Sequence, residues 1–347
     1  MPPSREFLVI LRTLVIGLAG AMVFQYFNMP AAFMSGALVA VAASAVAGVK
    51  VAMPNGVRNI AFYCAGLFFG TTVNQDTVNS LTAWPFSIAA LAVSLIAIMT
   101  LLPRYLERVH GYDRETAGLS AVPGALSFVL VLALERGADI RRITIVQTSR
   151  LAILIVLLPI AFSFTSEIRP LGTNAEDAME LSQALWLYGI AALGIPAAFV
   201  LRIPAPFFSG PFFLVGALFG AGVYEGALPS FMLWPALAGL GAAIGSRFAG
   251  VDMSMLREGA LAGLGSTSIG LAIAAGLALP VAHWLGLPFL QLWLAFAPGG
   301  IDALTVVAFS LGADPAFVAG HQMLRFIGLS LLLPFAAKWF GLDAPRA

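Results

Sequence analysis

The chain has 347 residues, of which 60% are hydrophobic and 10% charged, and its formal net charge is +1. An ordinary soluble domain carries about 25% charged residues, so this composition excludes a soluble protein and favours a helical protein with many membrane spans. The near-neutral charge, the single cysteine and three histidines far apart in sequence argue against a nucleic-acid surface, a disulfide framework and a metal site.

Twelve apolar segments follow one another along the chain, each long enough to approach the ~30 Å thickness of a bilayer core. The first segment is too long for the hydrophobic region of a signal peptide, so we expect it to remain as a membrane helix. The first six segments lie at 7–27, 30–48, 57–74, 84–103, 115–135 and 141–164. The other six lie at 183–201, 205–223, 229–247, 258–283, 288–311 and 316–340. This pattern predicts a first membrane repeat (1–164), a polar linker (165–182) and a second membrane repeat (183–347).

The two sets share a sequence pattern that predicts an internal duplication. The stretch "PGALSFVLVLALERGAD" from Pro123 recurs as "PGGIDALTVVAFSLGAD" from Pro298, and "PAAFMSG" from Pro30 recurs as "PAPFFSG" from Pro204. The matching Pro, Gly, Asp and Arg residues lie 174 or 175 positions apart. A shared bias toward Leu and Ala would not place these residues in register.

The positions of lysine and arginine distinguish two topologies. If all twelve segments cross and the N-terminus is inside, ten of these residues lie inside and six outside. If the segments after Tyr112 and Leu287 enter and return on one side, fifteen lie inside and only Arg169 outside. The positive-inside rule prefers the second arrangement. We therefore expect each repeat to have five crossings and one re-entrant or broken segment, which inverts the repeats and leaves both termini in the cytoplasm.

The Pro-Gly breaks are the main candidates for a solute site. Pro123 and Gly124 interrupt one segment, and Pro298, Gly299 and Gly300 interrupt the other. Backbone groups freed at such breaks must face protein or a water-filled cavity. The helical arm that follows each break points its positive dipole end there, which suits an anionic solute. The alternative is an ordinary proline kink.

Two arginines lie about ten residues into apolar helices. Arg150 follows Gln147, and Arg325 follows Gln322, with the same spacing. An arginine near the centre of a membrane helix costs at least about 2.5 kcal/mol, so it should be paired or line a water path. One interpretation has the arginines hold a carboxylate or phosphate. The other has them bind the carbonyl oxygens freed at the breaks, or a nearby acid.

Three aspartates lie in or next to the broken segments. Asp302 follows Pro298 by four residues, and its counterpart in the first repeat is Ser127. Asp302 is the candidate coupling residue for a proton or sodium ion, or it neutralises an arginine. Asp139 and Asp314 are expected to be turn or cap residues of the next helices.

Hydroxyl groups in the apolar helices suggest either sodium binding or helix packing. They occur in "GLGSTSIG" (263–270) and at Ser35 and Ser209. Ser and Thr are common at helix–helix contacts in membranes, so we expect contacts here.

The sequence also resembles a known family. "TAGLSAVPGALS", "LERGADIRRITIVQTSRLAILIVLLP" and "APGGIDALTVVAFSLGADPAFVAGHQMLRFIGLSLLLP" are similar to the duplicated membrane proteins of the AbrB type, over about residues 14–340. The resemblance implies a bacterial inner-membrane protein, labelled as a transcriptional regulator or an ammonia monooxygenase. An oxygenase needs clustered metal ligands, and a direct transcription factor needs a basic element outside the membrane. The sequence offers neither.

We therefore expect a non-enzymatic protein without cofactor or metal, namely a secondary transporter or exporter of a small anionic or zwitterionic solute by alternating access. The alternative is a non-transporting membrane regulator that docks a partner through a loop such as 104–115. Expected partners are the bilayer, the solute and a coupling proton or sodium ion, without direct nucleic acid binding. Self-association stays open. The predicted solute-site residues are Pro123, Gly124, Arg150, Pro298, Gly299, Gly300 and Arg325, with Asp302 for coupling.

Overall fold

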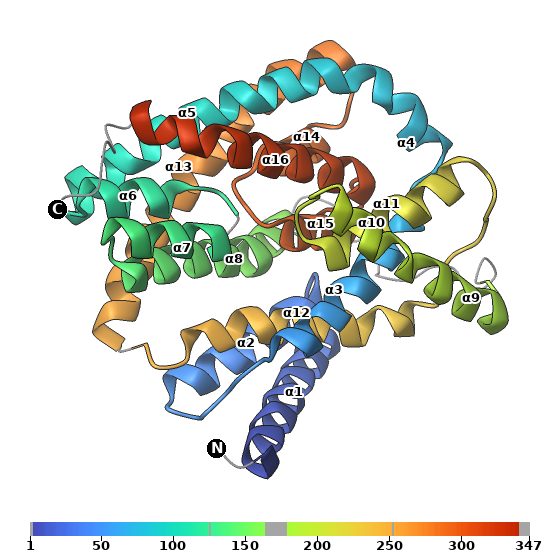
Figure 1. Ribbon diagram of the computed structural model, residues 1–347, viewed down its shortest axis with the longest axis horizontal. Helices are drawn as coiled ribbons and strands as arrows, with labels where there is room; N and C mark the ends of the chain where they lie inside the picture. The colour runs from blue at the N-terminus through green and yellow to red at the C-terminus, as the bar shows by residue number, and fades with distance from the viewer. Residues whose placement is uncertain (1–2, 125, 164–178, 252, 340–347) are drawn as a thin grey trace. The chain divides into compact units, whose positions relative to one another are not determined.

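The structure, a computed structural model, describes residues 3–124, 126–163, 179–251 and 253–339, and all regular secondary structure in these ranges is helical (Figure 1). Most of the predicted linker lies outside the described residues. The helices before it are α1 (Pro3–Tyr26), α2 (Ala32–Val46), α3 (Asn55–Gly70), α4 (Gln75–Ser80), α5 (Trp84–His110), α6 (Arg114–Ala121), α7 (Leu126–Arg136) and α8 (Ile140–Ser163). Those after it are α9 (Leu181–Ala192), α10 (Gly194–Val200), α11 (Pro206–Gly220), α12 (Trp234–Gly245), α13 (Met253–Leu285), α14 (Phe289–Phe296), α15 (Ile301–Ser310) and α16 (Pro315–Trp339).

Length and apolar composition make this a fold compatible with a multi-pass membrane protein. In the described part of the chain, five helical stretches are long and apolar enough to cross a bilayer. They are Glu6–Tyr26, Trp84–His110, Ile140–Phe162, Leu181–Val200 and Met255–Leu285. Three shorter apolar helices, α2, α11 and α15, accompany them.

Both predicted helix breaks are present. The segment predicted at 115–135 is α6 followed by α7, and the one predicted at 288–311 is α14 followed by α15. The non-helical residues between these pairs contain the proline and glycine residues that predicted the interruption. Gly124 adopts a φ of 82°, in the left-handed region that favours glycine.

The chain divides into two compact units, and each unit takes helices from both predicted repeats. Unit 1 comprises 1–81, 155–251 and 305–316, and unit 2 comprises 82–154, 252–304 and 317–347. In unit 1, α2 packs on α1 and α12, and α3 packs on α11. In unit 2, α5 packs on α13 and α6. The units are therefore defined by packing between helices that are far apart in the sequence, and neither unit corresponds to one predicted repeat.

Glycines set the close helix contacts of unit 1. A Cβ atom at Gly66 on α3 would collide with the backbone of Phe208 on α11. A Cβ atom at Gly241 on α12 would collide in the same way with the backbone of Met34 on α2. The two glycines lie 175 positions apart in the sequence, and each allows a close approach to the backbone of a neighbouring helix.

Ser35 and Ser209 are buried, and their hydroxyls also form hydrogen bonds within their own segments. Each donates to carbonyl oxygens at the start of its own helix, Ser35 to Pro30 and Ser209 to Pro204. These serines close matching left-handed turns before α2 and α11. In "GLGSTSIG", Ser266 and Thr267 likewise bond within α13, while the contact to Ser149 of α8 is made by Gly263. Ser266 and Thr267 are themselves buried, so this stretch is packed as the sequence predicts.

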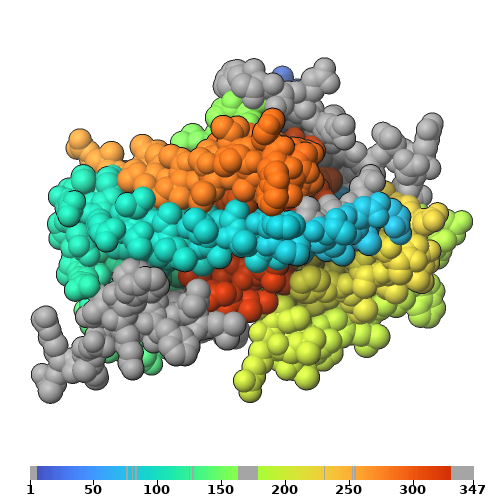
Figure 2. All heavy atoms as spheres, turned by 90° about the horizontal axis from the view of Figure 1, so that it is seen from above, coloured from blue at the N-terminus to red at the C-terminus, as the bar shows by residue number. Residues whose placement is uncertain are grey.

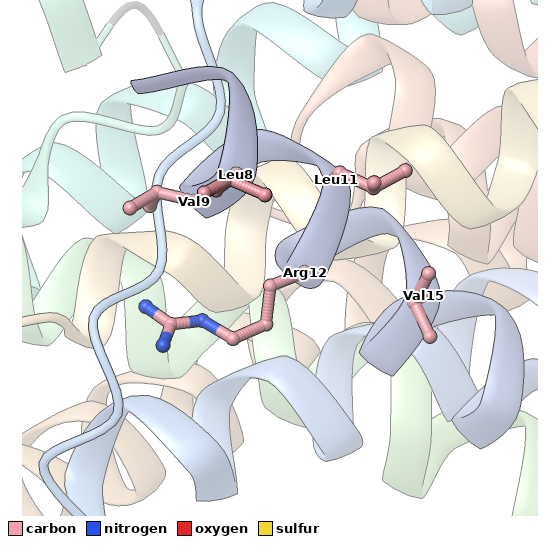
Figure 3. Close-up of a pocket in the computed structure, with 5 residues that line it drawn as sticks. All are labelled: Leu8, Val9, Leu11, Arg12 and Val15. Atoms are coloured by element: carbon pink, nitrogen blue, oxygen red, sulfur yellow. The ribbon is translucent and has the colours of Figure 1, made fainter. Parts of the chain in front are cut away.

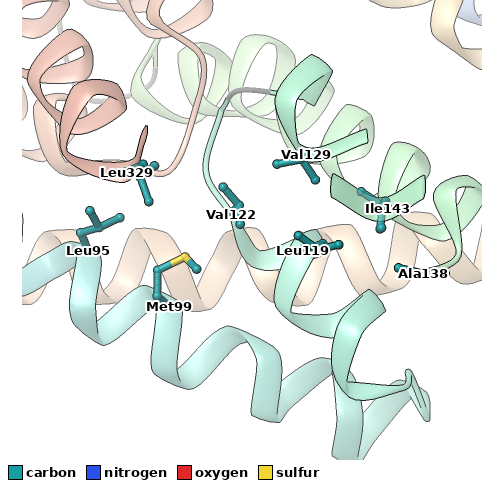
Figure 4. Close-up of a cluster of buried hydrophobic side chains, with 9 residues drawn as sticks. Leu95, Met99, Leu119, Val122, Val129, Ala138, Ile143 and Leu329 are labelled. Atoms are coloured by element: carbon teal, nitrogen blue, oxygen red, sulfur yellow. The ribbon is translucent and has the colours of Figure 1, made fainter. Parts of the chain in front are cut away.

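In unit 2, α5 and α13 lie alongside one another, as Figure 2 shows in cyan and orange, and run in opposite directions. Phe86 near the start of α5 contacts Trp284 at the end of α13, with ring centroids 4.9 Å apart. Tyr105 near the end of α5 meets Gly265 in the first half of α13. A buried apolar cluster joins α5 to α6, α7, α8 and α16 (Figure 4), and consists of Leu95, Met99, Leu119, Val122, Val129, Ala133, Ala138, Ile143 and Leu329.

Candidate functional site

The first break is held by side chains of α8. The guanidinium of Arg150 donates from Nη2 to the Val122 carbonyl oxygen at 2.9 Å and from Nη1 to that of Ala121 at 3.4 Å. One turn earlier, the amide of Gln147 donates to the Leu119 carbonyl oxygen at 3.0 Å. The carbonyl oxygens at the end of α6 would otherwise lack partners in an apolar surrounding. Arg150, 2% exposed, therefore stabilises the break from within the protein.

The second break is held in the same way by α16. The Arg325 guanidinium donates from Nη1 to the Ala297 carbonyl oxygen at 2.6 Å and from Nη2 to that of Gly299. The Gln322 amide donates to the carbonyl oxygens of Leu294 and Ala297 at 2.9 and 3.2 Å. These contacts fit the second interpretation of the Gln-x-x-Arg pattern, in which the side chains bind freed carbonyls. A role in binding solute stays a prediction.

The two breaks meet inside unit 2. A Cβ atom built on Gly124 would lie 3.6 Å from the Gly299 carbonyl oxygen and 3.9 Å from Nη2 of Arg325. The Arg325 guanidinium, which holds the second break, therefore also lies beside Gly124 of the first break. The Nε atoms of both arginines are buried without a hydrogen-bond partner within the described chain. The residues predicted for a solute site are thus brought together from opposite halves of the sequence.

The other predicted residues lie beside this meeting point. Pro123 and Pro298 are buried, and the Pro298 ring touches Gly270 of α13. Asp302 is half-buried in the first turn of α15, next to Gly300, where a carboxylate is favoured by the helix dipole. The side chain of Ser127, its predicted counterpart, lies outside the described residues.

The first break is the tip of a helical hairpin. The hydroxyl of Thr116, in the first turn of α6, accepts a hydrogen bond from the backbone N–H of Asp139 at 2.9 Å. Glu115 pairs with Arg136, the last residue of α7, at 3.9 Å. The beginning of α6 therefore lies beside the end of α7, so the chain turns back at Pro123–Gly124.

The second break has the corresponding arrangement. Phe317, in the first turn of α16, contacts Trp84 at the start of α5, with ring centroids 5.8 Å apart. Phe86 in the same turn of α5 contacts Trp284 at the end of α13, which leads into α14. The chain therefore enters as α14 and has returned by the first turn of α16. The antiparallel helices α5 and α13 lead directly into the segments that contain the first and the second break, and the two breaks meet within unit 2.

Asp139 and Asp314 are helix caps, as the sequence predicts. Asp139 Oδ1 accepts from the backbone N–H groups of Arg141 and Arg142 at the start of α8. Asp314 Oδ1 accepts from the backbone N–H of Ala316 at the start of α16. Neither aspartate needs a solute to explain its position.

A buried histidine that the sequence did not predict as a functional residue lies on α16. His321 of α16 is fully buried, and its Nε2 lies 2.7 Å from the hydroxyl of Ser87 on α5. Its Nδ1 lies 2.9 Å from the carbonyl oxygen of Phe317. The available sequence signal was its position immediately before Gln322, whose counterpart Gln147 follows a valine, Val146.

A pocket on α1 lies apart from these residues in the sequence and is of a different kind. Figure 3 shows its lining: the aliphatic side chains of Leu8, Val9, Leu11 and Val15, together with Arg12. The Arg12 guanidinium donates to the carbonyl oxygen of Lys50 in the same unit. Within the described residues, no three His, Cys, Asp or Glu side chains are grouped as metal ligands.

Comparison with known proteins places the sequence in a family. Residues 33–341 match the family described as transition state regulatory protein AbrB. The chain is 26% identical over 352 aligned positions, and 96% of both chains, to a protein of Escherichia coli K12 named "Putative regulator AbrB". It is also 29% identical to a protein of Bacillus subtilis 168 named "Uncharacterized protein YhjN", covering 78% of this chain and 74% of that one. Since the matched region spans most of the sequence, the chain belongs to the AbrB family.

Proposed function

We propose that this protein is a secondary transporter of a small anionic or zwitterionic solute, with its site where the two hairpin tips meet. The observation that carries the proposal is the approach of Gly124 to Gly299 and Arg325 in the interior of unit 2. Paired broken helices that meet inside a membrane protein are a recurrent plan of transporter solute sites. Irregular backbone at that depth is tolerated only against protein or a water-filled cavity.

The proposal includes an inverted repeat, each half with five crossings and one re-entrant hairpin. Contacts that match at offsets of 174 and 175 support it: Gly66 meets Phe208 as Gly241 meets Met34. Arg150 donates to the Val122 carbonyl oxygen and Arg325 to that of Ala297, in each case 28 residues earlier in the chain. Gln147 and Gln322 bind the same two breaks. The helices α5 and α13 are equivalent at an offset of 175, and they run antiparallel in unit 2, as an inverted repeat requires.

An anionic group is favoured by the charges at the meeting point. The N-terminal ends of α7 and α15, which carry positive partial charge, begin at the two breaks. Arg150 and Arg325 add two full positive charges, of which the carbonyl oxygens of the breaks compensate part. Asp302 contributes the opposite charge and is our candidate for coupling to a proton or sodium ion. A carboxylate-bearing solute would complete this balance.

The second candidate function is that of a membrane-embedded regulator that does not transport a solute. It is favoured by the name "Putative regulator AbrB" of the Escherichia coli relative. The segment 104–115, which joins α5 to α6, contains exposed charged residues that a soluble partner could bind, including Arg104, Arg108 and Arg114.

Electrical recording from reconstituted protein tests the transporter. Vesicles containing the protein would be adsorbed on a solid-supported membrane and exposed to jumps of monocarboxylates, dicarboxylates, amino acids and phosphate esters. We expect transient currents with at least one of these classes and none with empty vesicles. If no class gives a current, while a soluble protein binds the chain only when segment 104–115 is intact, the regulator replaces the transporter.

A further inference from the structure

We propose that His321 and Ser87 form a reversible proton-binding site inside unit 2. The proposal uses the repeat described above but does not depend on transport. It starts from the position of His321, a fully buried side chain of α16 with both ring nitrogens in contact with polar atoms. Ionisable residues within membrane helices are rare and commonly mark function.

The hydrogen-bond geometry accepts both charge states of the imidazole. The carbonyl oxygen of Phe317 can only accept, so Nδ1 of His321 carries a hydrogen. In the neutral ring, Nε2 then accepts from the Ser87 hydroxyl at 2.7 Å. In the protonated ring, Nε2 donates to the same oxygen, and the Ser87 hydroxyl turns to the carbonyl oxygen of Trp84, 3.0 Å away. A proton can therefore bind without leaving a buried donor or acceptor unpaired.

The side chains around His321 are mostly aromatic and aliphatic, so few other groups there could bind the proton. His321 stacks on the Phe317 ring at 4.1 Å and lies 5.0 Å from the ring centroid of Trp84. The cluster that contains both of these aromatic residues is otherwise supplied by α5, α13 and α14, and its described members are apolar. The nearest charged residue along α16 is Arg325, one turn away, whose Nη atoms are bound to carbonyl oxygens of the break.

The repeat provides an internal comparison. At an offset of 175, His321 corresponds to Val146, and Ser87 corresponds to Ala262. Val146 and Ala262 lie together in one apolar cluster, so the fold accepts an aliphatic pair at this position. Since packing does not require a polar pair, the histidine and serine add a property that the equivalent position lacks.

Proton binding at this site would alter the second break. His321 directly precedes Gln322, and Arg325 lies one turn beyond, so the new charge appears beside the two side chains that hold the carbonyl oxygens of Leu294, Ala297 and Gly299. The first break, with Val146 at the equivalent place, has no such response. The site thus makes one hairpin tip sensitive to protons.

Fluorescence of Trp84 provides the test, because an imidazolium quenches an adjacent indole. The other tryptophans, Trp186, Trp234, Trp284, Trp293 and Trp339, would be replaced by Phe, and emission recorded in lipid nanodiscs across the histidine range, from about pH 4 to 9. We expect emission to fall reversibly on acidification, and to be independent of pH after His321→Val. Val146→Ala is the matched control and should leave the titration unchanged. Emission that is independent of pH in both proteins, or that falls equally in both, would overturn the proposal.

A second measurement leaves His321 and Ser87 themselves unchanged. With His110 and His283 replaced by Gln, nitrogen-15 NMR reports the tautomer of His321 directly. We expect hydrogen on Nδ1 at high pH and on both nitrogens at low pH. A ring with hydrogen on Nε2, or one that stays neutral throughout, would contradict the hydrogen-bond scheme. Either result leaves the transport assay unaffected, so the two proposals fail separately.

Discussion

At the residue scale, Arg150 and Arg325 are first of all structural. Each replaces the hydrogen bonds that the end of a short helix loses at its break, and each does so with a forked donor that reaches two carbonyl oxygens. Their Nε atoms remain buried without a partner in the described chain, so each guanidinium keeps a donor that the break does not use. Binding of carbonyls and attraction of an anion are thus compatible roles.

Arg150→Gln and Arg325→Gln should both destabilise the protein, by about 1.5–3 kcal/mol for each charged hydrogen bond lost. Lysine should not restore stability, because one ammonium group does not reproduce the fork. Thermal unfolding in detergent measures the effect. Arg104→Gln, at an exposed position, serves as the control. Unchanged melting of both buried-arginine variants would show that the carbonyl contacts do not support the breaks.

A second residue-scale prediction separates backbone strain from blocking of the site. Gly124 and Gly137 both have positive φ, 82° and 67°, so Leu at either position costs about 1–2 kcal/mol. Only Gly124 faces the other break, since Gly137 has open space around it. Gly124→Leu should abolish the currents that identify the solute, and Gly137→Leu should retain them. Equal loss in both variants would remove the site from the hairpin tips.

The roles of residues that bind only neighbours in the sequence could be predicted. Asp139 and Asp314 were predicted as caps because a carboxylate after a Gly-Ala turn satisfies N–H groups only a few positions away. The choice between the two roles of Arg150 could not be made, because it depends on the distance to carbonyls 28 residues earlier. His321 was missed because its partner, Ser87, is distant in the chain.

At the element scale, close helix packing rests on glycines at equivalent positions. Gly66→Ala and Gly241→Ala place a Cβ atom against the backbone of a neighbouring helix, and each should cost about 1–3 kcal/mol. Gly189→Ala, in α9 with nothing within 4 Å, is the control and should be neutral or slightly stabilising. A loss at only one of the first two sites, measured by thermal unfolding, would contradict their equivalence.

Tyr112, buried directly before α6, should make the stability of the protein depend on pH. Burial raises the pKa of Tyr112 to about 12, helped by Glu258 and Asp139 and opposed by Arg142. Tyrosine in an unfolded chain has a pKa of about 10, so the folded protein holds this proton more tightly. The stabilisation is complete below about pH 10 and is lost as pH rises toward 12. Melting temperature should therefore fall less steeply over this range in Tyr112→Phe; identical slopes would refute the assignment.

Element boundaries were largely predictable because proline and glycine mark them. All twelve predicted segments are helical, and the two that contain Pro-Gly breaks are interrupted there. The short helix α4 was not predicted, because it lies in a polar connection between two apolar segments. The separation of α9 from α10 at Leu193 was not predicted either. The hairpin was expected from charge counting and agrees with the contact of Thr116 with Asp139.

At the scale of the whole molecule, the chain forms its two units from both halves of its sequence. The predicted repeats describe how the sequence is organised, whereas the units describe which helices pack together. Sequence periodicity could not reveal this division, because each apolar helix has several faces suited to packing. The contacts of α2 with α12 and of α3 with α11 decide it in unit 1.

Labelling of single cysteines tests most directly the proposal that the two hairpins enter from opposite faces of the membrane. Arg108 and His283 are exposed, equivalent at an offset of 175, and lie at the ends of α5 and α13 where the hairpins begin. With Cys64 replaced by Ser, each position would carry the sole cysteine in cells exposed to a membrane-impermeant thiol reagent. We predict that His283→Cys reacts in intact cells and Arg108→Cys only after permeabilisation. Reaction of both in intact cells, or of neither until permeabilisation, would contradict the inverted arrangement.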